Sequence, residues 1–101
     1  MALTIKDKGN RIILEGSTSA IDVKICSRPI VVTSWLWINP ATVADEFECV
    51  DSDGDTEFFG ECSVADQPMS DDFSLGHATK GALFCKTLGS GKVIIYYKDY
   101  A

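Results

Sequence analysis

Three aspartates at alternate positions, Asp51, Asp53 and Asp55 in the segment VDSDGDTEFF, have the carboxylate oxygens that calcium binds. They match the first, third and fifth places of the calcium loop of helix–loop–helix proteins. The sixth place of such a loop needs glycine and the twelfth a bidentate glutamate, but these places hold Thr56 and Cys62. Helical flanks are also missing, because the chain on both sides alternates like β-strands. We therefore expect no metal site, with a weak ion site as the alternative.

The same residues predict the tip of a β-hairpin. Asp53-Gly54 is a favoured pair for a two-residue type I′ turn, in which both residues have positive φ. This turn would place Cys49 opposite Phe58 and put Phe47, Cys49 and Phe58 on one apolar face. The opposite face would then be mostly acidic, as a half-buried antiparallel pair requires.

Other residues that could take part in catalysis or ligand binding occur without the rest of a motif around them. His77 is the single histidine, and no motif around it supplies the nucleophile and the orienting group that covalent catalysis needs. We expect it to be a solvated loop residue. The segment LGSGK, Leu88 to Lys92, lacks the spacing of a phosphate-binding loop and is expected to be a hairpin turn. These observations predict a protein that is not an enzyme and has no catalytic residues and no cofactor.

The four cysteines, Cys26, Cys49, Cys62 and Cys85, are widely spaced and contain no CxxC pair. Paired spacing is what makes a zinc site a strong prediction, so we expect none. The N-terminal segment MALTIKDKGN has no apolar stretch of the kind that a secretory signal contains. We expect free thiols that behave as small buried apolar side chains in a reducing compartment, with a disulfide or metal role as the alternative.

Strands are the elements that must position all these residues. Runs of β-branched and aromatic residues recur with turn signals about every ten residues, and no long helical period is present. The pattern predicts one all-β domain over residues 1–101, an antiparallel sandwich or barrel of about seven to eight strands. The polar stretch 65–81 is expected to be a loop with one irregular strand around Phe73. No apolar run is long enough to cross a membrane.

Two of the predicted strands are apolar on both faces. In IVVTSWLWI, Trp35 and Trp37 share one face, and Val32, Leu36 and Ile38 share the other. The closing strand KVIIYYKDY has the same property. Since one small domain has one interior, we expect the second faces to be buried against another chain. The predicted interface residues are Trp35, Trp37, Ile94, Tyr96 and Tyr97. The alternative is that the two tryptophans form a platform that stacks on a sugar.

Charge is unevenly distributed along the chain, whose net charge is −6. The segment 41–80 is strongly acidic, and the segments on both sides of it carry a small positive charge. A nucleic-acid-binding protein places a basic patch against the phosphates, and no such patch is evident, so we expect no nucleic-acid partner. The acidic segment is expected to face solvent or a basic neighbour.

The order of these segments resembles that of small virion proteins of tailed bacteriophages, of the head-decoration, cement or accessory structural type. WLWINPATVADEFECVDSDGD is followed by an acidic middle and then by GALFCKTLGSGKVIIYYK, so the resemblance covers roughly residues 30–98. It implies a compact β-sandwich or barrel, present in many copies on a phage particle and assembled in the host cytoplasm. The implied partners are copies of the chain itself or a capsid or tail protein. A carbohydrate- or host-surface-binding module is the alternative.

Overall fold

The protein is an all-β sandwich of two antiparallel sheets. The computed structural model describes residues 3–16, 23–64 and 67–99, and nine strands lie within these ranges rather than seven or eight. The strand expected around Phe73 is present as β7, and it is longer than expected, since it occupies most of the stretch 65–81. The strands are β1 (Thr4–Asp7), β2 (Arg11–Glu15), β3 (Val23–Cys26), β4 (Ile30–Ile38), β5 (Glu46–Val50), β6 (Thr56–Glu61), β7 (Met69–Ala78), β8 (Leu83–Leu88) and β9 (Lys92–Asp99).

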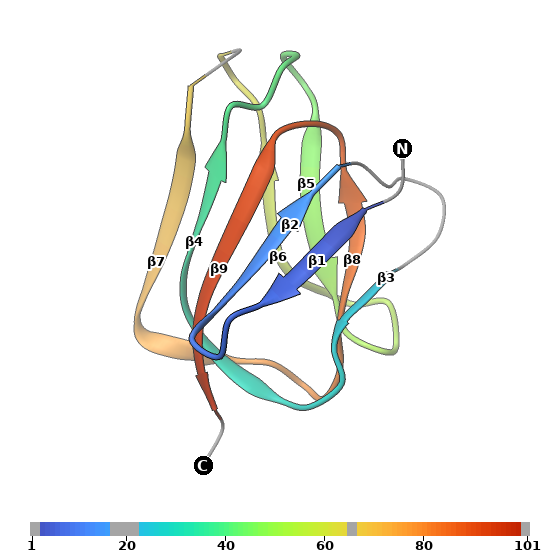
Figure 1. The fold of residues 1–101 in the computed structure, drawn as a ribbon, viewed down its shortest axis with the longest axis vertical. Helices are drawn as coiled ribbons and strands as arrows, with labels where there is room; N and C mark the ends of the chain where they lie inside the picture. The colour runs from blue at the N-terminus through green and yellow to red at the C-terminus, as the bar shows by residue number, and fades with distance from the viewer. Residues whose placement is uncertain (1–2, 17–22, 65–66, 100–101) are drawn as a thin grey trace.

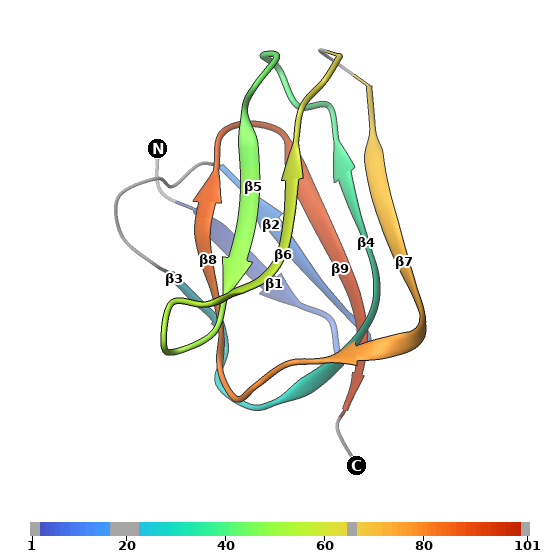
Figure 2. The same cartoon turned by 180° about the vertical axis from the view of Figure 1, so that it is seen from behind.

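The larger sheet has the strand order β1-β2-β9-β4-β7, and the smaller has the order β3-β8-β5-β6. Figure 1 shows the larger sheet with β1, β2 and β9 in front, and Figure 2 shows β5, β6 and β8 of the smaller sheet from behind. Two pairs of consecutive strands form hairpins within one sheet, namely β1–β2 and β5–β6. The remaining links carry the chain from one sheet to the other, so the molecule is a sandwich and not a closed barrel.

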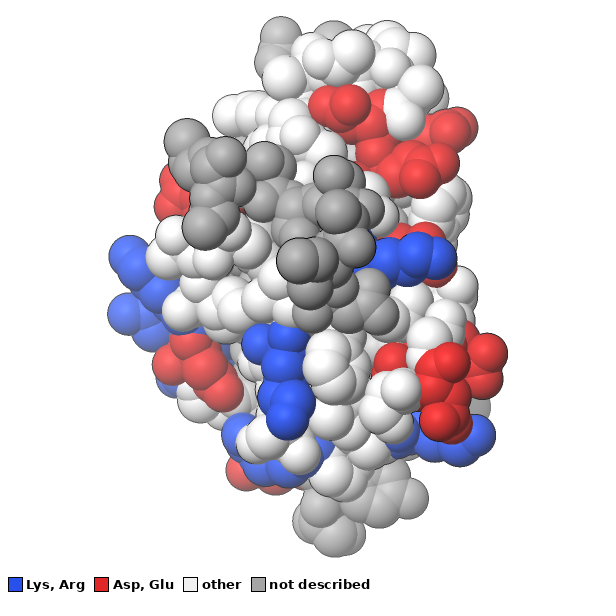
Figure 3. Space-filling view, turned by 90° about the vertical axis from the view of Figure 1, so that its right-hand side faces the viewer, with Lys and Arg blue, Asp and Glu red and all other residues white. Residues whose placement is uncertain are grey.

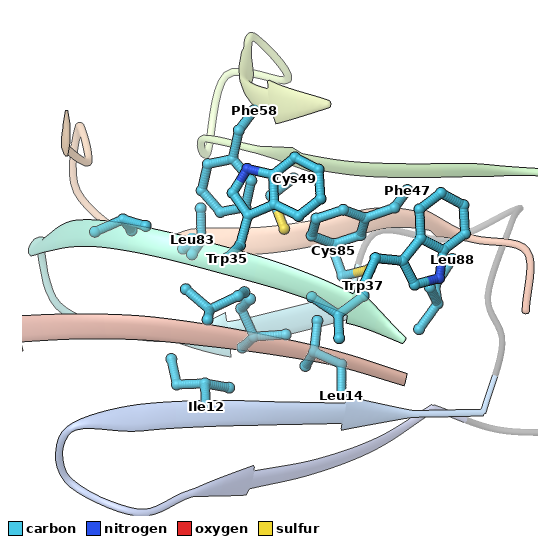
Figure 4. Packing of buried hydrophobic residues seen from close by; sticks show 14 of the residues in the cluster. Ile12, Leu14, Trp35, Trp37, Phe47, Cys49, Phe58, Leu83, Cys85 and Leu88 are labelled. Carbon is cyan, nitrogen blue, oxygen red and sulfur yellow. The ribbon is translucent and has the colours of Figure 1, made fainter. Parts of the chain in front are cut away.

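The core lies between the sheets and is formed by alternate residues of each strand, as period-2 patterning predicts. Figure 4 shows Trp35 and Trp37 of the larger sheet pointing toward Phe47 and Phe58 of the smaller one. The Trp35 and Phe47 rings meet edge to face with centroids 5.3 Å apart, and the Trp35 and Phe58 rings are stacked. The predicted apolar face of Phe47, Cys49 and Phe58 is confirmed.

A β-bulge in β4 changes the face on which one predicted residue lies. Val32 pairs with Tyr97 and Ser34 with Tyr96, so Thr33 is an extra residue on β4. The bulge shifts the alternation by one position. Val32 is therefore fully buried on the same side as Trp35, not on the opposite face as the uninterrupted pattern predicted.

The tip of the β5–β6 hairpin confirms the predicted turn and corrects its type. Cys49 pairs with Phe58 as expected. The Gly54 amide donates to the Asp51 carbonyl, and the Asp51 amide donates to the Asp55 carbonyl. Within this turn only Gly54, at φ 86°, has positive φ. These bonds define a three-residue loop, in which a type I turn is followed by a left-handed glycine, instead of a two-residue type I′ turn.

The LGSGK segment is a turn, but the hairpin prediction for it is wrong. Strand β8 pairs with β3 and β5, whereas β9 pairs with β2 and β4. The turn therefore carries the chain across the sandwich from the smaller sheet to the larger. The Trp37 indole N–H donates to the Ser90 carbonyl at 2.7 Å, which fixes this crossing against the core.

Candidate interaction surface

Three of the predicted interface residues lie inside the molecule. Trp35 and Trp37 are 3% and 0% exposed, and Tyr97 is 4% exposed. The chain's own second sheet covers them, so the expectation that these three contact another chain is wrong. For the same reason the tryptophans cannot form a sugar-stacking platform. The other two residues, Ile94 and Tyr96, point to the opposite side of β9.

Ile94 and Tyr96 belong to the outer face of the larger sheet, by which we mean the side turned away from the smaller sheet. Strand pairing places Ile13, Ile94 and Leu36 next to one another in a row across β2, β9 and β4. All three are partly exposed. Tyr96 lies beside this row and is 37% exposed. The outer face thus has an apolar centre made by three neighbouring strands.

Charged residues surround this apolar row. On one side of it, Arg11, Tyr96, Ser34 and Asp72 form a parallel row across four strands. On the other side, Glu15 pairs with Lys92, and Lys92 pairs with Ile38. The rim therefore carries both positive and negative groups. An apolar centre with a mixed polar rim is the usual composition of a protein–protein contact.

A shallow pocket of about 380 Å³ continues the outer face at one end. Its lining contains one acidic and one basic residue beside Ile38 of β4, and consists of Glu15, Ile38, Asn39, Gly91 and Lys92. Asn39 has a φ of 54°, which turns the chain sharply after β4. The pocket gives the outer face a concave margin beside its apolar row.

His77 is not a solvated loop residue, which corrects the expectation for it. It lies in β7, where it pairs with Val32, and its Nε2 is 2.9 Å from Glu57 Oε1 on β6. The other Glu57 oxygen accepts the Lys80 amide at 2.8 Å. The His77 ring also contacts the rings of Phe58 and Phe73. Since β6 and β7 are the edges of different sheets, this contact joins the two sheets along one side of the sandwich.

The carboxylates of Asp51, Asp53 and Asp55 come together at the hairpin tip, within 4.8 Å of one another. Asp51 is 5% exposed, and its Oδ1 accepts the amides of Asp53 and Asp55 at 2.8 and 3.0 Å. Aspartate side chains commonly stabilise turns in this way. The turn thus explains the Asp51 carboxylate, whereas Asp53 and Asp55 contribute their backbone amides to it.

The surface seen from the side of β3 and β8 carries both signs of charge (Figure 3). Lys and Arg lie mainly on the left and in the centre of this view, and Asp and Glu form groups on the right with two basic residues between and below them. On this side the charges are interspersed and form no single basic patch. The described residues include no helix long and apolar enough to cross a membrane.

Comparison of the chain with protein-family models, with curated proteins and with solved structures gave no match.

Proposed function

We propose that this protein is a non-enzymatic structural subunit that binds a second copy of itself through the outer face of the larger sheet, as a component of a bacteriophage particle. The observation that carries the proposal is the row Ile13–Ile94–Leu36, an apolar centre between two rows that each contain charged residues of both signs. The particle context comes from the resemblance of residues 30–98 to virion proteins. Two of the five interface residues predicted from the sequence, Ile94 and Tyr96, remain part of this surface.

The outer face is complementary to itself. If two copies stack with a two-fold axis along the strands, Ile94 of one lies over Leu36 of the other, and Arg11 lies over Asp72. If the axis runs across the strands, the apolar rows meet and Arg11 lies over Glu15. Both arrangements follow from the strand register. Each brings apolar groups together at the centre and opposite charges together at the rim, as an isologous contact requires.

The size of the surface predicts a weak contact. The surface spans four strands, which lie about 4.8 Å apart, and three rows of outward-facing residues along each strand. Measured as a flat rectangle, its area is roughly 400 Å². A standard stable interface buries about 800 Å² on each partner. We therefore expect association that depends on protein concentration, and that becomes strong only where many copies are held together, as on a particle.

Sedimentation velocity over a range of protein concentrations tests the proposal. We expect the weight-average mass to rise from that of a monomer toward that of a dimer as the concentration approaches about 1 mM, the affinity range of small interfaces. Ile94→Asp should abolish this rise, because it places a charge in the apolar centre. Phe59→Asp is the matched control. Phe59 is 48% exposed on β6 of the other sheet, so its replacement should leave the association unchanged.

Charge-reversal substitutions then distinguish the two possible orientations of the two-fold axis. Arg11→Glu should weaken association by placing like charges opposite each other. A second substitution, Asp72→Arg, should restore it if the axis runs along the strands, and Glu15→Arg should restore it if the axis runs across them. The proposal is wrong if the protein stays monomeric at all concentrations, or if Ile94→Asp and Phe59→Asp weaken association equally.

A further inference from the structure

Two of the four free cysteines face each other across neighbouring strands. Cys49 of β5 and Cys85 of β8 are directly paired in the antiparallel register, and both are 0% exposed. Figure 4 shows both side chains in the core between the sheets, beside the rings of Trp35, Trp37 and Phe47. The register of β5 and β8 shifts by one residue just before this pair. Directly opposite residues in an antiparallel pair have Cα atoms about 4.5–5.5 Å apart. A disulfide accepts Cα separations of about 4.4–6.8 Å, so this pair can be bridged with little backbone movement.

The other two thiols occupy different surroundings. Cys26 pairs with Leu83, and its Sγ lies 3.3 Å from the Arg28 carbonyl. The Sγ of Cys62 lies 3.4 Å from the Val64 carbonyl. Cys62 follows the end of β6 and takes part in no strand pairing, so neither residue is paired with another cysteine in the sheets. Among the four cysteines, therefore, the sheet register brings one pair together and leaves two apart.

We propose that Cys49 and Cys85 form an oxidation site, at which glutathione disulfide converts the two thiols into a disulfide that links β5 to β8. One thiolate attacks glutathione disulfide and releases one glutathione. The second thiolate then attacks the mixed disulfide and releases the other. The protein loses two hydrogens and two electrons, and one glutathione disulfide becomes two glutathione molecules. This inference does not depend on the proposed function.

Burial controls when the reaction takes place. Removal from water raises the pKa of the Cys49 thiol, and the neighbouring Cys85 thiol raises it further. The thiolate is the reactive form, so the folded protein at neutral pH resists oxidation. The bond forms while β5 and β8 are transiently separated or before folding is complete. A chain folded in a reducing compartment therefore stays a dithiol, and one that opens under oxidising conditions becomes locked.

Refolding in a glutathione redox buffer tests the site. The full chain is unfolded in urea, diluted into a mixture of reduced and oxidised glutathione, blocked with an alkylating reagent and mapped by mass spectrometry without reduction. We expect one linked peptide pair that contains Cys49 and Cys85. The bridged protein should melt on the order of 10 °C higher than the reduced protein, since the bond closes a long loop. Native protein in the same buffer should be oxidised at least tenfold more slowly.

Two variants make the result specific. The double variant Cys26→Ala with Cys62→Ala keeps the facing pair and should form the bridge to the same extent as the unmodified chain. Cys85→Ala removes one partner, and it should form no intrachain bridge to Cys49. The inference is overturned if all four thiols of the refolded chain remain free, if the bridge joins other cysteines, or if the native protein is oxidised as fast as the refolding one.

Discussion

Both tryptophans of β4 are buried, but they differ in whether the indole N–H has a hydrogen-bond partner. The Trp37 indole N–H donates to the Ser90 carbonyl at 2.7 Å. The Trp35 indole N–H is buried among the described residues without a hydrogen-bond partner, enclosed by the rings of Phe47 and Phe58. An unpaired buried donor costs about 1–3 kcal/mol of folding free energy. The two residues therefore contribute differently to stability despite their equal size.

Replacement of each tryptophan by phenylalanine measures this difference. Both changes remove the same volume from the core and leave a comparable cavity. Trp37→Phe also breaks the hydrogen bond to the Ser90 carbonyl, whereas Trp35→Phe removes a donor that has no partner. We expect Trp37→Phe to lower the free energy of unfolding by about 1–2 kcal/mol more than Trp35→Phe. Urea denaturation of the two variants provides the comparison, and equal losses would contradict it.

At the scale of the elements, the β5–β6 hairpin depends on the side chain of Asp51. This buried carboxylate accepts two backbone amides that would otherwise have no partner in the turn. Asp51→Ala should therefore lower the free energy of unfolding by about 1–2 kcal/mol. Asp53→Ala should cost little, because the Asp53 side chain is 70% exposed. Thermal melts of the two variants give the measurement.

The same melts, recorded with calcium and then with a chelator, separate the turn from an ion site. If Asp51 serves the turn, the melting temperature of the unmodified protein is the same in both buffers. A bound ion stabilises a folded protein by mass action, so a rise in melting temperature with calcium that Asp53→Ala abolishes would favour the ion site.

The sequence predicted the strands well because each strand depends on local alternation. Phe47, Cys49 and Phe58 share the buried face that their spacing indicated. The errors occur where a single extra residue or a distant partner decides the outcome. The bulge at Thr33 moved Val32 to the core side, and a bulge is not visible in a pattern of apolar residues.

The interface prediction failed in part for a related reason. The apolar pattern of β4 and β9 indicated two buried faces but not which face the second sheet would cover. That choice depends on contacts between strands far apart in the chain. The Glu57–His77 contact was missed because it joins the edges of two sheets, and no local spacing indicates it.

At the scale of the whole molecule, one polar network joins three parts of the chain at one end of the sandwich. The Tyr97 hydroxyl donates to Asp7 Oδ1, and Arg28 donates to the Tyr97 hydroxyl at 3.2 Å. Arg28 also pairs with Asp99. The network therefore ties the end of β1, the link between β3 and β4, and β9. The Tyr97 hydrogen bond is the main cause that lowers the pKa of Asp7, and burial raises the pKa of Tyr97.

These two pKa shifts predict how stability depends on pH. The pKa of Asp7 lies below its ordinary value of 3.8, so its contribution is present above that pH and is lost as the pH falls through the folded-state value. The pKa of Tyr97 lies above its ordinary value of 10.0, so its contribution is present below that pH and is lost as the pH rises through the folded-state value. Both contributions are present together at neutral pH.

The substitution Asp7→Asn tests the part of this pH-dependent stability that comes from Asp7. The Asp7 side chain is 37% exposed, so solvent screening keeps its contribution small, and we expect a loss of at most about 1 kcal/mol at pH 7. The loss should shrink as the pH falls below the pKa of Asp7, where the native carboxyl is itself neutral. Urea denaturation of both proteins at pH 7 and in acid measures this change. A loss that is the same at every pH would contradict this assignment, because an asparagine keeps the shape of the side chain and removes the charge to which the Tyr97 hydroxyl donates.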